Sequence, residues 1–134
     1  MKLLLDTHIF LRYIAGDTQL PEAWRQMIND PRNRVYLSVV SMWEAIIKFQ
    51  TGRLPLPEAP ETYIPRLRTQ HRILVLPVGE ESVARVALLP LIHRDPFDRL
   101  LIGQAIQHGL TLITSDAAIR AYPTAPIILA VSLL

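Results

Sequence analysis

Short apolar runs alternate with longer segments of helical spacing along the chain. Continuous apolar runs bounded by turn residues predict strands that are buried on both faces. Strands are expected at residues 2–6, 34–38, 72–78 and 110–114, with a final strand and tail in 125–134. Helices are expected at residues 7–16, 21–29, 41–52, 61–71, 80–91, 95–109 and 115–122. This alternation predicts an α/β domain around a mostly parallel sheet.

Start and stop signals support several of these boundaries. Thr7 is the expected N-cap of the first helix, and Gly16 is its expected stop. The Pro-rich stretch 54–60 predicts a loop, and Pro65 predicts an interruption in the helix around it. Neither a repeat nor a linker divides the sequence, so residues 1–134 are expected to form a single domain.

Composition limits the classes of protein that remain. Half of the 134 residues are apolar, which excludes a disordered chain, yet no apolar run approaches the roughly 20 residues of a membrane span. The absence of cysteine removes disulfides and thiolate metal sites and fits a reducing, cytoplasmic location. A net charge of +2 is a weak indication of a nucleic-acid partner by itself.

Four acidic residues follow the expected strands. Asp6, Glu44, Asp98 and Asp116 each stand at the end of a strand or in the first turn of a helix. In open parallel sheets, ligands bind beyond the carboxyl ends of the strands, so these four side chains are expected along one edge.

Helix capping is the competing explanation for each acid taken singly. The segment "SMWE" has the form of a capping box, with Ser41 as N-cap and Glu44 reaching back to it. "DPFD" has a similar form, with Asp95 as the expected N-cap and Asp98 at the third helical position. The sequence favours one role for each aspartate, a cap for Asp95 and a metal ligand for Asp98.

Four carboxylates at one edge would repel one another unless a cation joined them. An oxygen-only site suits a hard divalent cation, and the four scattered histidines make a zinc site a poor alternative. A cation held in this way can activate water for attack on phosphorus, so phosphodiester hydrolysis is the expected reaction. The chain lacks the Gly-rich loop of P-loop enzymes.

These motifs resemble those of PIN-domain ribonucleases, and in particular the VapC-type toxins of toxin–antitoxin pairs. The resemblance rests on "MKLLLDTHIFLRYI", "LSVVSMWEAIIK", "HRDPFDRLLIGQA" and "LTLITSDAAIRAYP", in this order over nearly the whole chain. It implies a three-layer α/β/α sandwich with a five-stranded sheet, and Mg²⁺ or Mn²⁺ held by Asp6, Glu44, Asp98 and, least securely, Asp116. It also implies cleavage of RNA, a homodimer and a cognate antitoxin protein.

Other residues are candidates for supporting roles. Thr7 and Thr114 are expected to contact a metal-bound water or a neighbouring carboxylate, although capping and strand-end roles explain them equally well. Arg99 and Arg12 are the candidates for binding substrate phosphate, with a solvated surface arginine as the alternative. Two further functions stay open at this point: an RNA-processing nuclease outside any toxin pair, and a PIN-like binding module without catalysis.

Overall fold

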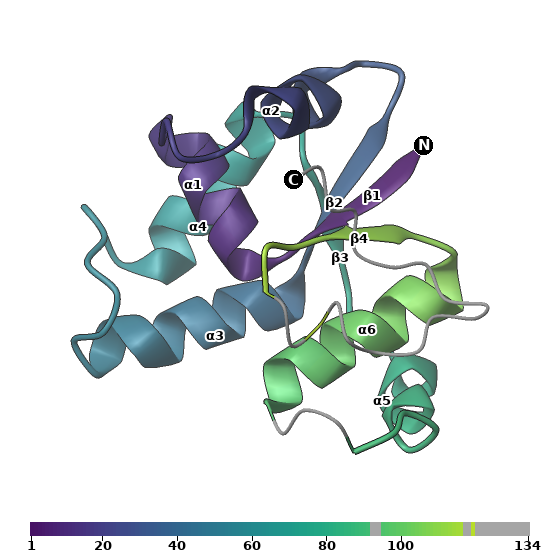
Figure 1. Ribbon diagram of the computed structural model, residues 1–134. Coiled ribbons are helices and arrows are strands. Elements are labelled where there is room, and N and C mark those ends of the chain that lie inside the picture. Colours follow the sequence, from purple (N-terminus) through teal and green to yellow (C-terminus); the bar gives the residue numbers. More distant parts are fainter. Residues whose placement is uncertain (92–94, 117–118, 120–134) are drawn as a thin grey trace.

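The computed structural model describes residues 1–91, 95–116 and 119, and within them four strands form one parallel sheet (Figure 1). The strands are β1 (Lys2–Leu5), β2 (Arg34–Ser38), β3 (Leu74–Leu76) and β4 (Thr111–Ile113), arranged in the order β3-β2-β1-β4. In the central strand, Leu4 lies opposite Tyr36 on one side and Leu112 on the other. The first four expected strands are therefore confirmed, whereas the expected strand in 125–134 lies outside the described residues.

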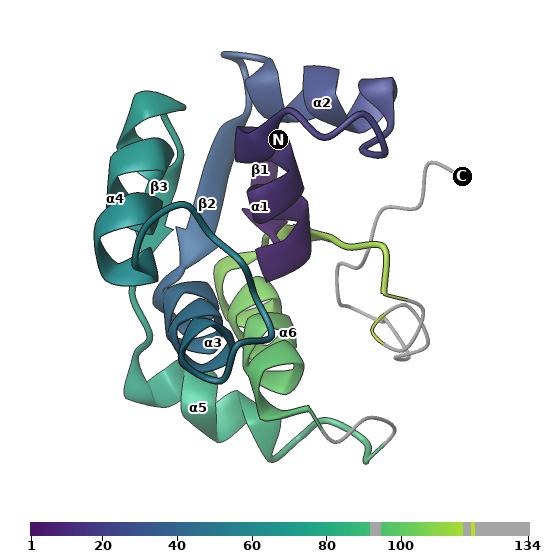
Figure 2. The ribbon, with the colours of Figure 1, turned by 90° about the vertical axis from the view of Figure 1, so that its left-hand side faces the viewer.

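Helices cover both faces of the sheet. They are α1 (Thr7–Ala15), α2 (Glu22–Asn29), α3 (Val39–Gln50), α4 (Pro60–Gln70), α5 (Glu80–Val86) and α6 (Pro96–His108). Figure 1 shows α1, α2 and α4 on one side of the strands, with α5 and α6 on the other. Figure 2 shows α3 and α6 beside one another beyond the strand ends. No helix in the described residues has the length and hydropathy needed to span a membrane.

The alternation of side chains along β1 divides the core into two parts. Leu3 and Leu5 pack into a cluster with Phe10, Trp24 and other residues of the first face. Leu4 points the opposite way and packs with residues of α6 such as Leu101. A strand buried on both faces has to be apolar at every position, which explains the run "LLL". The expected three-layer α/β/α sandwich is confirmed.

Four expectations about helix ends and interruptions are wrong, and one of them is the end of α5, which stops at Val86 rather than at residue 91. The N-cap of α1 is Asp6, which accepts from the His8 amide, so Thr7 is the first helical residue. The N-cap of α3 is Ser38, which accepts from the Val40 amide at 3.0 Å and lies three residues before the expected cap, Ser41. Glu44 is then well inside the helix, where it has no capping role.

Pro65 does not interrupt α4, which runs without a break from Pro60 to Gln70. Proline removes the amide that would bond to the carbonyl four residues earlier, which here belongs to Glu61. Glu61 is exposed in the first turn of the helix. Water can therefore satisfy this carbonyl, and the helix loses less than it would in its interior.

Helices α5 and α6 approach each other closely at Gly103, which lies in the middle of α6. A Cβ atom at this position would lie 2.9 Å from the backbone oxygen of Ser82 in α5. Because this neighbour is backbone, it cannot rotate away as a side chain would. Glycine is required here by the short distance between the helices.

We expect Gly103→Ala to destabilise the protein by about 1–3 kcal/mol, because the added methyl group forces α5 away from α6. Urea unfolding monitored by circular dichroism measures this change. The matched control is Gly79→Ala, where a Cβ atom meets nothing within 4 Å and φ is negative. Equal stability of the two variants would contradict the assignment of close helix contact.

Candidate active site

The candidate site lies at the carboxyl edge of the sheet, between β1 and β4. The chain leaves β1 through α1 and α2 on one face, and it reaches β4 from α5 and α6 on the other. The connections therefore change sides between these two neighbouring strands, which is the position where open α/β sheets bind ligands. Asp6 directly follows β1, and Thr114 directly follows β4.

Asp6 is held by groups from both strand ends. Its side chain is only 4% exposed, and one oxygen accepts from the His8 amide at 3.3 Å. The other oxygen accepts from Thr114 Oγ1 at 2.6 Å, and the Asp116 amide donates to the same hydroxyl at 3.0 Å. The segment after β4 is thus tied to the end of β1, and Thr114 holds the Asp6 carboxylate in one orientation.

Glu44 is the second buried carboxylate, at 3% exposure. Thr7 Oγ1 lies 2.7 Å from Glu44 Oε1 and 2.9 Å from Ser41 Oγ. A hydroxyl has one proton, so Thr7 gives it to the charged acceptor and takes one from Ser41. Lys48 Nζ lies 2.7 Å from the other oxygen, Oε2. Both oxygens of Glu44 therefore have partners, one from α1 and one from α3 itself.

Burial raises the pKa of the Asp6 carboxyl above its ordinary value of 3.8, and desolvation is the largest cause. The Thr114 hydroxyl and His8 act in the opposite direction, while the negative charge of Glu44 raises the pKa further. This effect of Glu44 on the Asp6 carboxyl indicates that the two side chains lie near each other at this edge.

Asp98 and Asp95 occupy different positions at the start of α6. Asp95 is the N-cap and accepts from the amides of Phe97 and Asp98, which confirms the expected capping role. Asp98 is 6% exposed in the first turn of the helix. The neighbouring Phe97 contacts Trp43 of α3 edge to face, with ring centroids 5.0 Å apart. This contact joins the two helices that carry Glu44 and Asp98.

The two candidate arginines have different surroundings. Arg99 is 8% exposed, and its guanidinium donates to the backbone oxygens of Val86, Leu89 and Pro90. These bonds attach the segment after α5 to α6, so the position of Arg99 supports a structural role rather than substrate binding. Arg12 is partly exposed on α1, one turn beyond His8. Its role in binding substrate stays a prediction.

The carboxylates at this edge are the candidate ligands for a divalent cation. Among residues 1–91, 95–116 and 119, no three acidic or histidine side chains stand close enough together to form a metal-binding group. The chemistry of the donors nevertheless fits a hard cation, because the buried side chains are carboxylates and hydroxyls. The raised pKa of Asp6 indicates that added positive charge would be favourable at this edge.

Sequence reasoning missed two residues of this network. One is Lys48, whose spacing of four residues from Glu44 on a helix is the standard arrangement of an ion pair. The other is Ser41, the expected N-cap, which is buried inside α3 and contacts Thr7. No local signal would have identified this contact, since it joins residues 34 positions apart.

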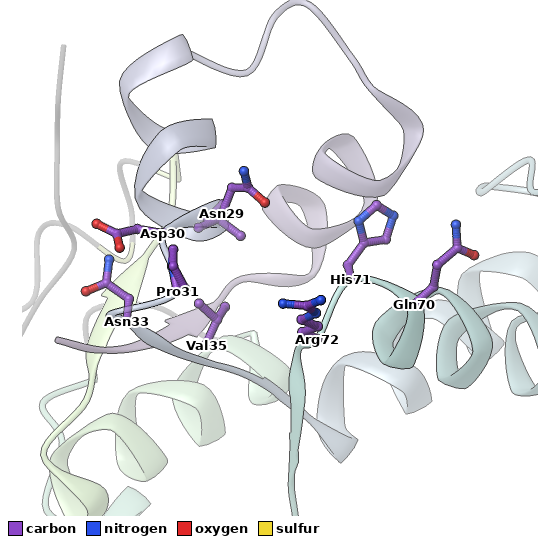
Figure 3. A pocket seen from close by; sticks show the side chains of 9 residues that line it. Asn29, Asp30, Pro31, Asn33, Val35, Gln70, His71 and Arg72 are labelled. Carbon is purple, nitrogen blue, oxygen red and sulfur yellow. The ribbon is translucent and has the colours of Figure 1, made fainter.

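A separate hollow lies at the opposite end of the strands. It has a volume of about 320 Å³ and is lined by residues from the segment before β2 and from the end of α4, including Asn33, His71 and Arg72 (Figure 3). Its acidic residue, Asp30, is paired with the neighbouring Arg32. None of the four predicted metal ligands lines this hollow, so the buried carboxylates make the sheet's carboxyl edge the better candidate.

The raised pKa of Asp6 leads to a prediction about stability in the absence of added metal. The pKa of the Asp6 carboxyl is higher in the folded than in the unfolded protein, so its protonated form contributes stability below about pH 4. This contribution is lost as the pH rises through the folded-state pKa. An asparagine can accept from His8 and donate to Thr114, so Asp6→Asn keeps both contacts. We expect it to raise the free energy of unfolding at pH 7, because the neutral amide has no charge to desolvate.

Urea unfolding between pH 4 and pH 8 in the presence of EDTA measures this difference, which should shrink towards acidic pH. Asp17→Asn, at an aspartate that accepts from an exposed backbone amide, is the control. A less stable Asp6→Asn protein at pH 7 would contradict the argument from desolvation.

Comparisons with known proteins agree with this architecture. The PIN domain family model matches residues 3–124. Ribonuclease VapC22 of Mycobacterium tuberculosis is 27% identical over 119 residues, which cover 89% of this chain and 90% of the relative. VapBC2 of Rickettsia felis, solved with a DNA fragment from its promoter, matches with a TM-score of 0.69 and 16% identity, over 96% of this chain and 97% of the other. DNA-bound VapBC from Salmonella typhimurium matches with a TM-score of 0.63 and 21% sequence identity, over 96% of both chains. The buried acids of this sheet edge thus lie in a chain that belongs to the PIN domain family.

Proposed function

We propose that the protein is a metal-dependent endoribonuclease toxin of the VapC type, which hydrolyses phosphodiester bonds in RNA. The observation that carries the proposal is the pair of buried carboxylates, Asp6 and Glu44, each fixed by a threonine hydroxyl at the sheet's switch point. A purely structural role does not require two buried carboxylates at one edge of a sheet. The curated relative VapC22 is named as a ribonuclease, which supports the same activity here.

The proposed roles of the residues follow from their positions. Asp6, Glu44 and Asp98 would hold Mg²⁺ or Mn²⁺, with Asp116 as a further ligand. The bound cation supplies an activated water and offsets negative charge on the phosphoryl group. Thr114 and Thr7 orient the carboxylates, because each donates a hydrogen bond to one of them. Arg12 would contact an RNA phosphate from the exposed side of α1.

The proposed partners are an RNA substrate, a second copy of the chain and a cognate antitoxin, in the cytoplasm. Several solved structures of similar fold are of VapBC proteins bound to DNA, which motivates the antitoxin. Trp43 is 56% exposed next to the candidate site. A large exposed aromatic side chain is typical of a protein-binding surface.

We expect Asp98→Asn to abolish RNA cleavage, because the neutral amide is a poor ligand for a hard cation. The matched control is Asp95→Ser in the same turn, which keeps an N-capping side chain and should retain cleavage. Purified proteins are compared on total RNA after EDTA treatment and addition of Mg²⁺ or Mn²⁺, with circular dichroism to verify folding.

The outcomes distinguish the candidate functions. Wild-type cleavage by Asp98→Asn would exclude this residue as a ligand, and loss of cleavage in both variants would give Asp95 a role beyond capping. A wild-type protein that binds RNA without cutting it would favour the binding module. Cleavage without toxicity in cells, and without an adjacent antitoxin gene, would favour an RNA-processing nuclease.

We expect Trp43→Ser to weaken the complex with the antitoxin by about 10-fold or more, since a tryptophan that becomes buried in an interface is a frequent hot spot of binding. Calorimetric titration of the purified toxin with the product of an adjacent antitoxin gene measures the Kd. Trp43→Phe, which keeps an aromatic side chain against Phe97, is the control. An unchanged Kd for Trp43→Ser would place the antitoxin on another surface.

A further inference from the structure

Lys48 contacts one of the proposed metal ligands, although neither the sequence motifs nor the family comparison assigns it a role. Its ammonium is 2.7 Å from Glu44 Oε2, while the other carboxylate oxygen is taken by Thr7. Glu44 is almost fully buried, so its charge needs a nearby cation in the protein without metal. Lys48 provides that cation from one turn further along α3.

The Lys48 side chain is suited to a replaceable contact. It is 25% exposed, whereas the Glu44 side chain is 4% exposed, so the ammonium reaches the carboxylate from the solvent side. A lysine has a flexible four-carbon stem and a strongly hydrated charge, so it can turn into water without movement of the helix. The carboxylate, in contrast, is fixed by Thr7 and by burial.

From these contacts we infer that Lys48 is a positioning residue that substitutes for the metal at Glu44 and competes with it. In the metal-free protein, its ammonium neutralises Glu44 and holds Oε2 in place. A divalent cation bound by Glu44 is repelled by this ammonium, and Lys48 turns towards solvent when the cation binds. The inference rests on the proposed role of Glu44 as a metal ligand.

Loss of the Lys48 charge should change stability and metal affinity in opposite directions. Removal of the Lys48 charge destabilises the metal-free protein, because Glu44 loses its counter-charge. The same change strengthens metal binding, because the incoming cation no longer meets a positive charge. An ordinary structural ion pair has the opposite effect: its loss lets Glu44 move and weakens the metal site. Metal affinity therefore separates the two roles.

The test is calorimetric titration of purified protein with Mn²⁺. We expect Lys48→Met to lower the Kd about 10-fold relative to wild type, the scale of a charge–charge interaction near the protein surface. Lys48→Gln, which keeps a hydrogen-bond donor without the charge, should also lower it. Lys48→Arg keeps the cation and should bind Mn²⁺ as wild type does. Arg32→Met, which removes an exposed ion pair outside the site, is the matched control.

A second measurement makes the test independent of any one variant. Urea unfolding should show that Lys48→Met loses stability in EDTA and recovers relative to wild type in saturating Mn²⁺. Arg32→Met should show the same difference from wild type under both conditions. Wild-type protein that fails to bind Mn²⁺ would overturn both the proposed metal site and the role of Lys48. Wild-type binding, with equal or weaker affinity in Lys48→Met and Lys48→Gln, would overturn the inference about Lys48 alone.

Discussion

Burial of negative charge at the ends of parallel strands is the constraint on which this structure depends. Asp6 and Glu44 are nearly inaccessible to solvent, and the negative charge of Glu44 contributes to the raised pKa of Asp6. The fold offsets this cost by placing a hydroxyl against each carboxylate, from Thr114 and Thr7, and an ammonium against Glu44. The apolar strand β1, packed on both faces, supplies the rigid base that holds the two acids in position.

Much of the fold could be predicted from the sequence because β1 and α6 follow local rules. The run "LLL" indicates a strand buried on both faces, and Asp95 followed by Pro96 indicates where α6 begins. The alternation of strands and helices was sufficient for an α/β domain with a parallel sheet, and the resemblance to PIN domains supplied the three-layer arrangement. The exact start of α3 was not predictable, because Ser38 and Ser41 are equivalent capping residues by composition, and tertiary packing decides between them.

The site was predictable only in part, and the reason is distance along the chain. That Asp6 would stand at a strand end follows from its neighbours in sequence, but its contact with Thr114 joins residues 108 positions apart. The burial of Arg99 against the carbonyls of Val86, Leu89 and Pro90 was unexpected, because a sequence does not show which arginine a neighbouring segment will cover. Only tertiary structure separates this arginine from one that faces solvent.

The link between Asp6 and Thr114 has a consequence for the order of assembly. A chain emerging from the ribosome presents β1 and α1 first, yet β4 is needed before the Asp6 side chain is fixed. At roughly 5–20 residues per second, several seconds of synthesis separate the two segments. During that interval the sheet lacks the neighbour of β1 on one side, so its central strand is a temporary edge. The orientation of the Asp6 side chain is thus fixed only in chains that have been synthesised beyond β4.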